Sequence, residues 1–201
     1  MHTHPKKQQT YLMVKPDGVQ RGLVGDIIKR IEATGLKISA LKMFVPDEEN
    51  LLTHYGKADA WYQSKGEGIV KNREAAGLPI EKEAIDYGRG IIQALVSYMQ
   101  CGPVVAMVIE GNQAVAVIKK LVGSTEPATS DVGTIRGDLT LDSYEIANLD
   151  DRAVRNLVHC SDEPEEAQRE IKIWMSESDM HDYRSVHEAM LYDVNLDGTP
   201  E

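Results

Sequence analysis

The strongest constraint on the fold is an uninterrupted apolar run, Val104–Ile109, in the middle of this 201-residue chain. An apolar run of strand length, without alternation, is typical of a β-strand that is buried on both faces. The composition agrees with a globular protein, since 42% of the residues are hydrophobic and 27% are charged. It excludes a collagen, an intrinsically disordered chain and a disulfide-stapled scaffold.

Weaker strand and helix signals alternate on both sides of this run. Strand formers fill residues 10–15, 36–45 and 153–159. Helix signals follow each strand, at 24–31, from Pro46, from Pro79 to Met99, after Asn112, and from Ser161 to Trp174. Asn112 is one expected cap, and Asp162 with Glu165 has capping-box spacing. The order predicts an α/β sandwich with helices on a small sheet.

The charge is distributed unevenly along the chain. The net charge is −10, and residues 138–201 hold 17 acidic and 5 basic residues, against 15 and 17 in residues 1–137. A phosphate site should therefore draw its cations from the first two-thirds, and nucleic acid is an unfavourable partner. The two cysteines and the absence of an apolar leader predict a reducing, cytoplasmic location. Residues 90–109 are uncharged, but their polar and turn residues predict a helix, a turn and a strand rather than a membrane span.

His159 is the main candidate for chemistry. It ends a predicted strand just before a helix N-terminus, where free N–H groups attract anions. A histidine so placed can act as a nucleophile or as an acid and base. Glu170 lies at the edge of the apolar stripe of that helix, so it can orient the imidazole. Three alternatives stay open: a structural histidine, a Glu170–Lys172 salt bridge, and Cys160 as a thiol nucleophile.

Several cations and polar groups are available to bind a polyphosphate, although each alone is typical of a solvated surface. They are Lys15, Lys119, Lys120, Thr125, Arg136 and Asn156. The chain has no GxxxxGK[ST] loop, and its glycine pairs lack the third glycine of a dinucleotide site. A P-loop and a dinucleotide-binding fold are therefore unsupported.

Five segments resemble the nucleoside diphosphate kinase family, in the family's order. They are Tyr11–Gly25, His54–Tyr55, Cys101–Val108, Gly133–Asp138 and Arg155–Asp162. The resemblance covers residues 10–62, 91–137 and 153–192 and implies an α/β (α+β) fold. That fold is a ferredoxin-like βαββαβ sandwich, with a four-stranded antiparallel sheet covered by helices. We expect one domain over residues 1–201, insertions at 63–90 in the helical lid and at 139–152 after the phosphate loop, and a C-terminal extension at 176–201.

The resemblance also implies the roles of individual residues. His159 is expected to carry the phosphoryl group, Glu170 to hydrogen-bond its imidazole, and Ser161 to complete the bonding of that carboxylate. Lys15 and Tyr55 are expected beside the transferred phosphate. The expected nucleotide ligands are Lys15, Tyr55, Lys119, Thr125, Arg136 and Asn156, with Trp61, Tyr62 or Ile91 as the stacking partner of the base. No metal ligands are expected in the protein, because Mg²⁺ arrives on the nucleotide phosphates.

Two residues depart from the family pattern. Lys119 stands where the family commonly has an arginine, which removes a bidentate fork for the diphosphate. Cys160 replaces a glycine beside His159. Together with the insertions, these changes are expected to alter the affinity for the nucleotide. The residues expected around His159 are all present.

We therefore predict a nucleoside diphosphate kinase that passes the γ-phosphate of ATP to a nucleoside diphosphate by ping-pong transfer through His159. It is expected to form hexamers or tetramers, without a membrane partner. One alternative is a nucleotide-binding or regulatory protein on the same fold, with weak or lost transfer. A regulator that binds single-stranded DNA is disfavoured by the charge of −10.

Overall fold

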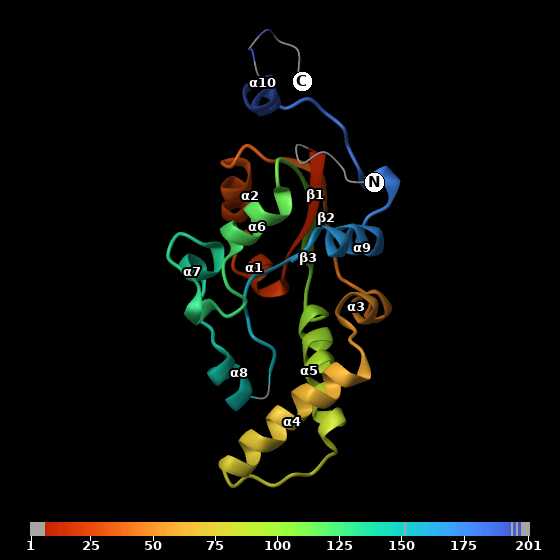
Figure 1. Cartoon of the computed structure of the whole chain (residues 1–201), viewed down its shortest axis with the longest axis vertical. Helices are drawn as coiled ribbons and strands as arrows, with labels where there is room; N and C mark the ends of the chain where they lie inside the picture. Colours follow the sequence, from red (N-terminus) through yellow and green to blue (C-terminus); the bar gives the residue numbers. More distant parts are fainter. Residues whose placement is uncertain (1–6, 151, 194, 196, 198–201) are drawn as a thin grey trace.

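The computed structural model describes residues 7–150, 152–193, 195 and 197. Within them, four strands form one antiparallel sheet in the order β2-β3-β1-β4. The strands are β1 (Gln8–Val14), β2 (Lys37–Phe44), β3 (Val104–Gly111) and β4 (Val158–Cys160). The predicted antiparallel sandwich is confirmed, and the apolar run lies in β3, with strands on both sides (Figure 1).

Helices cover both faces of this sheet, so the molecule has two apolar cores. Leu12 and Val14 of β1 point into a core with α2 (Val24–Glu32) and α6 (Ala114–Val122). Tyr11 and Met13 point to the other face. That second core is closed by α3 (Glu48–Tyr55), α5 (Ala84–Met99) and α9 (Pro164–Trp174). The period of two along β1 thus assigns alternate residues to opposite cores.

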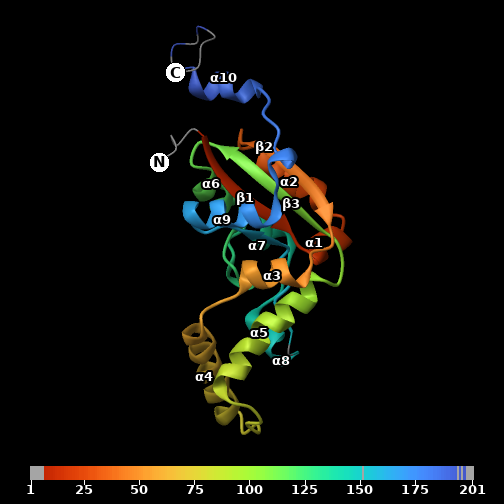
Figure 2. The ribbon, with the colours of Figure 1, turned by 90° about the vertical axis from the view of Figure 1, so that its right-hand side faces the viewer.

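A long helical hairpin extends away from the sheet (Figures 1 and 2). It consists of α4 (Asp59–Ala75) and α5, which pack against one another. Two glycines allow the close approach: a Cβ on Gly66 would lie 1.5 Å from the carbonyl oxygen of Ala84, and one on Gly88 would lie 2.0 Å from that of Tyr62. The polar sequence of α4 gave no helix signal, because this helix depends on backbone contact rather than on an apolar stripe.

Two local predictions are wrong, and a third is narrowed. The short strand expected within residues 153–159 is β4, which begins only at Val158, because Leu157 has a φ of 65° and breaks the extended run. Asn112 does not cap α6; its N-cap is Gln113, with a φ of 50°. The N-cap of α9 is Glu163, without a side-chain cap, and the carboxylate of Glu166, not Glu165, accepts from the backbone N–H of Asp162 at 2.7 Å.

The segment after α9 returns along β2. It contains η3 (Glu177–Asp179) and α10 (Val186–Tyr192). The backbone N–H of His181 donates to the carbonyl of Ser39 at 2.7 Å, and the buried ammonium of Lys37 lies 3.2 Å from Glu188 and 3.4 Å from Asp182. The segment therefore covers the first half of the β2 edge. Residues 194, 196 and 198–201 of the expected extension, and residues 1–6, lie outside the described residues.

Short helices complete the loops. They are α1 (Pro16–Gln20), η2 (Pro127–Thr129), α7 (Ile135–Leu139) and α8 (Tyr144–Leu149). In the part of the chain that the structure describes, no helix is both long enough and apolar enough to cross a membrane.

Candidate active site

His159 and Ser161 lie at the end of β4, and Glu170 reaches them from the second half of α9. The Nε2 atom of His159 is 2.9 Å from Oε1 of Glu170, and the Ser161 hydroxyl donates to Oε2 at 2.6 Å. The Glu170 side chain is 1% exposed and that of His159 is 19% exposed. Both oxygens of the carboxylate thus have partners, and Nδ1 remains as the nitrogen of His159 that can attack.

The electrostatics of this group favour a neutral imidazole. Burial, reinforced by the charge of Lys15, lowers the pKa of His159 to about 3. Burial raises the pKa of Glu170, and the hydrogen bond from Ser161 acts against this shift. A neutral imidazole has a free lone pair at physiological pH, which is what a nucleophile requires.

Aromatic rings surround His159 on the same face of the sheet. The ring centroid of His54 is 4.5 Å away, that of Tyr55 is 5.7 Å away and that of Tyr11 is 6.3 Å away. The hydroxyls of Tyr11 and Tyr55 are buried without a hydrogen-bond partner. Burial raises the pKa of Tyr55 strongly, so its phenol stays protonated and can donate.

The predicted phosphate ligands form a second group, joined through Asn156. The ammonium of Lys15 donates to the Asn156 side chain at 2.7 Å, and the Asn156 amide donates to the carbonyl of Thr125 at 2.8 Å. Lys15 is only 6% exposed. Burial, followed by the charge of Arg136, lowers the pKa of Lys15 to about 8. The Thr125 side chain is exposed at the loop that follows α6.

Arg136 is more firmly held than a surface cation. Its guanidinium donates to four backbone carbonyls, those of Gly123, Ser124, Asn156 and Val158, at 2.8–3.1 Å. These bonds engage most of its five N–H groups. Arg136 therefore ties the phosphate loop to β4, with limited capacity left for a ligand.

Lys119 and Cys160 border this group. The ammonium of Lys119 lies 3.2 Å from the Asp162 carboxylate, and its side chain is 52% exposed. Burial raises the pKa of the Cys160 thiol to about 11. A thiol that stays protonated is a poor nucleophile, so the structure argues against the thiol alternative.

The candidates for base stacking lie on the helical hairpin. Trp61 and Tyr62 are half-buried at the start of α4, with ring centroids 5.6 Å apart, and the Tyr62 hydroxyl accepts from the backbone of Lys57. Ile91 lies on α5 and is 38% exposed. Trp61 and Tyr62 pack against the second core, which also contains Tyr11 and Trp174.

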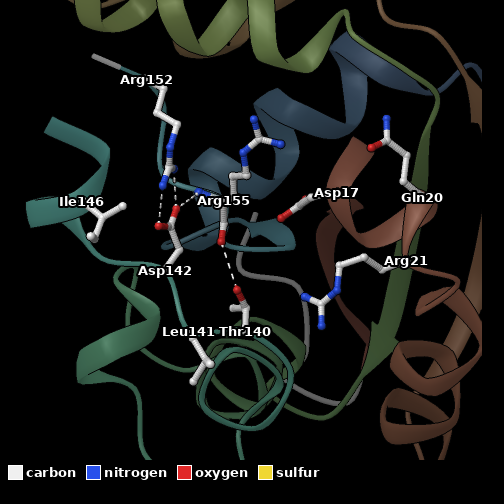
Figure 3. Close-up of a pocket in the computed structure, with 9 residues that line it drawn as sticks. All are labelled: Asp17, Gln20, Arg21, Thr140, Leu141, Asp142, Ile146, Arg152 and Arg155. Carbon is white, nitrogen blue, oxygen red and sulfur yellow. Dashed lines mark hydrogen bonds and ion pairs between the residues drawn. The ribbon is translucent and has the colours of Figure 1, made fainter. Parts of the chain in front are cut away.

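A pocket of about 440 Å³ is lined by residues of α1 and α8 and by Arg152 and Arg155 (Figure 3). Arg152 donates to both oxygens of Asp142 at 2.7 and 2.8 Å, and the backbone N–H of Arg155 donates to the same carboxylate at 2.6 Å. The hydrogen bond from Arg152 lowers the pKa of Asp142 to about 2. Residues 139–152 thus hold the backbone that leads to Asn156, although this pocket contains none of the predicted site residues.

One set of side chains has the donor atoms of a metal site. The ligand atoms of His54, His159 and Glu170 all lie within 4.8 Å of one another. However, the indole N–H of Trp174 already donates to Nδ1 of His54 at 3.1 Å. Two imidazoles would also suit a softer ion than Mg²⁺, which prefers oxygen ligands.

Sequence reasoning did not anticipate that His54 and Trp174 lie beside this centre. His54 appeared only as half of the His54–Tyr55 pair, and Trp174 only as a member of the apolar stripe. The spacing contained a usable signal, because Glu170 and Trp174 are four residues apart and share one face of α9.

Comparison with known proteins identifies the family of this chain. The nucleoside diphosphate kinase family model matches residues 8–78 and 83–180. A nucleoside diphosphate kinase of Pyrobaculum aerophilum is 44% identical over 178 residues, which cover 86% of this chain and 97% of the relative. One from Archaeoglobus fulgidus is 39% identical, with 92% and 98% covered.

Solved structures give the same result. An NDP kinase from Pyrobaculum aerophilum superposes with a TM-score of 0.80 at 42% identity, covering 88% of this chain and 100% of that one. A nucleoside diphosphate kinase from Borrelia burgdorferi, a transition-state mimic with bound vanadate and ADP, has a TM-score of 0.75 at 32% identity, with 93% and 98% covered. The chain belongs to the nucleoside diphosphate kinase family.

Proposed function

We propose that this nucleoside diphosphate kinase works through a phosphohistidine at His159. The observation that carries the proposal is the 2.9 Å contact between Nε2 of His159 and Glu170. It fixes the ring so that Nδ1 is the attacking atom. The Nδ1 lone pair forms a bond to the γ-phosphorus while the bond to the β-phosphate oxygen breaks, and the diphosphate leaves with that electron pair. A second diphosphate then attacks the phosphohistidine and reverses the step.

The cations around Asn156 stabilise the charge that spreads over the transferred group. Lys15 and Tyr55 have the positions for this role, because one is a buried ammonium and the other a buried, unpaired phenol. Arg136, Thr125 and Lys119 line the route of the diphosphate, and Trp61, Tyr62 and Ile91 are candidates for the base. Mg²⁺ enters as part of the substrate and, when bound, neutralises charge on the phosphate oxygens.

A solved relative supports this arrangement. The Borrelia burgdorferi structure holds vanadate and ADP as a transition-state mimic. This chain matches 98% of that one with a similar fold. We expect the same type of ligand, a nucleoside diphosphate with a trigonal oxyanion, to bind between His159 and Lys15.

We further propose a homo-oligomer, a hexamer or tetramer, in the cytoplasm. Apolar side chains are exposed near the end of β2: Leu41 is 50% exposed, Met43 is 58% and Val45, just after the strand, is 60%. Open apolar strand edges are covered by other chains or by devices that prevent pairing. The two free cysteines suit a reducing compartment. Residues 63–90 and 139–152 are proposed insertions, and 176–201 a C-terminal extension of a single domain.

The competing function is nucleotide binding without transfer. The observation behind it is Arg136, whose donors are largely used by backbone carbonyls. Such a protein would bind ATP and remain unphosphorylated.

Intact mass after brief incubation with ATP and Mg²⁺ separates the two functions. We expect one added phosphoryl group that is lost in acid and discharged by GDP. The His159→Gln variant should bind ATP and add none. Bound ATP without added mass in the natural chain would favour the binding protein, and added mass in His159→Gln would contradict the role of His159.

A further inference from the structure

His54 is a second imidazole beside the proposed nucleophile, with no role in the transfer described above. It lies in the last turn of α3 and is 2% exposed. Its ring plane is nearly perpendicular to that of His159, at 78°. Its Nδ1 lies 3.6 Å from Oε1 of Glu170. That oxygen is the one that contacts His159, so the two imidazoles face the same acceptor.

Trp174 determines which of the two imidazoles can donate to Oε1 of Glu170. It lies one turn after Glu170 in α9, on the same helical face. Its indole Nε1 donates to Nδ1 of His54 at 3.1 Å. Because an indole N–H can only donate, Nδ1 of His54 must accept and carries no proton. The neutral ring of His54 then has its proton on Nε2.

We infer that Trp174 is a positioning residue: by occupying Nδ1 of His54, it keeps Glu170 available to orient His159. The inference rests on the proposed role of His159. Without the indole, Nδ1 of His54 is free to carry the proton and to donate to Oε1 of Glu170. The carboxylate would then be shared between two imidazoles, and the orientation of His159 would be less defined.

Two further observations support this arrangement. Burial lowers the pKa of His54 to about 2, so the ring takes no second proton at physiological pH and Nδ1 remains an acceptor. The guanidinium of Arg169 donates to the carbonyls of Thr53 and His54 at 3.1 and 3.4 Å. This bond pair holds the end of α3 against α9, so the distance between the indole and the imidazole is fixed by both helices.

The test is a set of three variants assayed for the single-turnover rate of phosphorylation by ATP. Trp174→Phe keeps an aromatic ring and removes the donor, and we expect a rate about tenfold lower, the equivalent of one hydrogen bond. His54→Phe removes the competitor and should keep a nearly normal rate. In the double variant, His54→Phe should restore most of the rate that Trp174→Phe loses.

A merely structural role for Trp174 predicts another pattern. The losses would then add, and the double variant would be slower than either single one, which would overturn the inference. A normal rate in Trp174→Phe would overturn it as well. These outcomes are distinct from failure of the proposed function, in which His159→Gln still becomes phosphorylated.

Nitrogen NMR of imidazole-labelled natural protein keeps the inference falsifiable if a variant does not fold. We expect His54 to be neutral with its proton on Nε2, and the proton to move to Nδ1 in Trp174→Phe. A proton on Nδ1 of His54 in the natural protein would contradict the inference directly.

Discussion

The centre around His159 and the hairpin α4–α5 are held together in opposite ways. In the centre, side chains bind side chains, and Glu170 contacts both His159 and Ser161 while only 1% exposed. In the hairpin, backbone meets backbone at Gly66 and Gly88, where no side chain would fit. The centre therefore depends on which side chains are present, and the hairpin depends on positions without a side chain. Substitutions in the centre should change the transfer rate, and substitutions in the hairpin should change the stability.

The largest effect is expected at Glu170. Glu170→Ala removes the acceptor of the His159 Nε2 proton, so we expect phosphorylation by ATP to slow by roughly 10–1,000-fold, the range for one positioned partner. Glu165→Ala, on the exposed side of the same helix, is the matched control. A Glu170→Ala rate within twofold of the control would show that the carboxylate does not orient the nucleophile.

The next effect is a pH dependence from Lys15. Its pKa of about 8 means that the ammonium is charged below that pH and loses its charge above it. We expect the transfer rate to fall by about tenfold per pH unit once Lys15 is deprotonated. The Lys15→Arg variant, which stays charged, should lack this decline, and an identical decline in both proteins would exclude Lys15 as its cause.

This pH effect is separable from unfolding. Because the folded pKa of Lys15, about 8, is below its ordinary value of 10.5, the unfolded chain binds more protons between these values. The contribution of Lys15 to stability therefore rises with pH in that window. A fall in rate without a fall in melting temperature is the expected combination.

The hairpin should respond in stability rather than in chemistry. Gly66→Ala places a methyl group against the carbonyl of Ala84, and we expect a cost of roughly 1–3 kcal/mol, as for overpacking. Thermal unfolding should move down by roughly 2–12 °C. Gly68→Ala, two residues away with nothing within 4 Å of the added Cβ, is the control. Equal melting temperatures would mean that α4 and α5 are not in contact at Gly66.

The smallest effect is expected at Lys119, which lies in α6 and borders the centre through its ion pair with Asp162. Lys119→Arg gives the diphosphate a bidentate donor, and we expect its affinity to rise by roughly two- to tenfold, the value of one added hydrogen bond. Calorimetric titration with ADP measures this change. Lys120→Arg on the neighbouring exposed position is the control, and equal affinities in the two variants would remove Lys119 from the diphosphate site.

The sequence predicts the sheet better than the connections between its elements. The apolar run of β3 and the stripe of α9 follow from burial alone, because an unbroken apolar run of strand length has two faces to bury and an apolar stripe of helix period has one. The hairpin does not, because α4 is stabilised by glycine contacts with α5 that no local pattern encodes. Leu157 shows the same limit, since its left-handed φ shortens β4 although leucine favours an extended or helical backbone.

In the candidate site, the sequence indicates which polar residues are involved but does not predict how they lie relative to one another. His159 and Glu170 are separated by a helix start, so their proximity could be anticipated. The four carbonyls around Arg136 come from the loop after α6 and from Asn156 and Val158 at the start of β4, so their convergence is visible only in the fold. The exchange of partners between His54, Trp174 and Glu170 depends on distances of a few ångströms between α3 and α9, which sequence spacing does not give.

The ion pairs that hold the C-terminal segment against β2 determine how this segment responds to salt. Lys42 and Asp179 form an ion pair with about a third of each side chain exposed, whereas the Lys37 side chain is 5% exposed. Ionic screening weakens exposed pairs far more than buried ones. Rising ionic strength should therefore weaken the pair of Lys42 with Asp179 before the pair of Lys37 with Glu188, so that η3 loosens from β2 before α10 does.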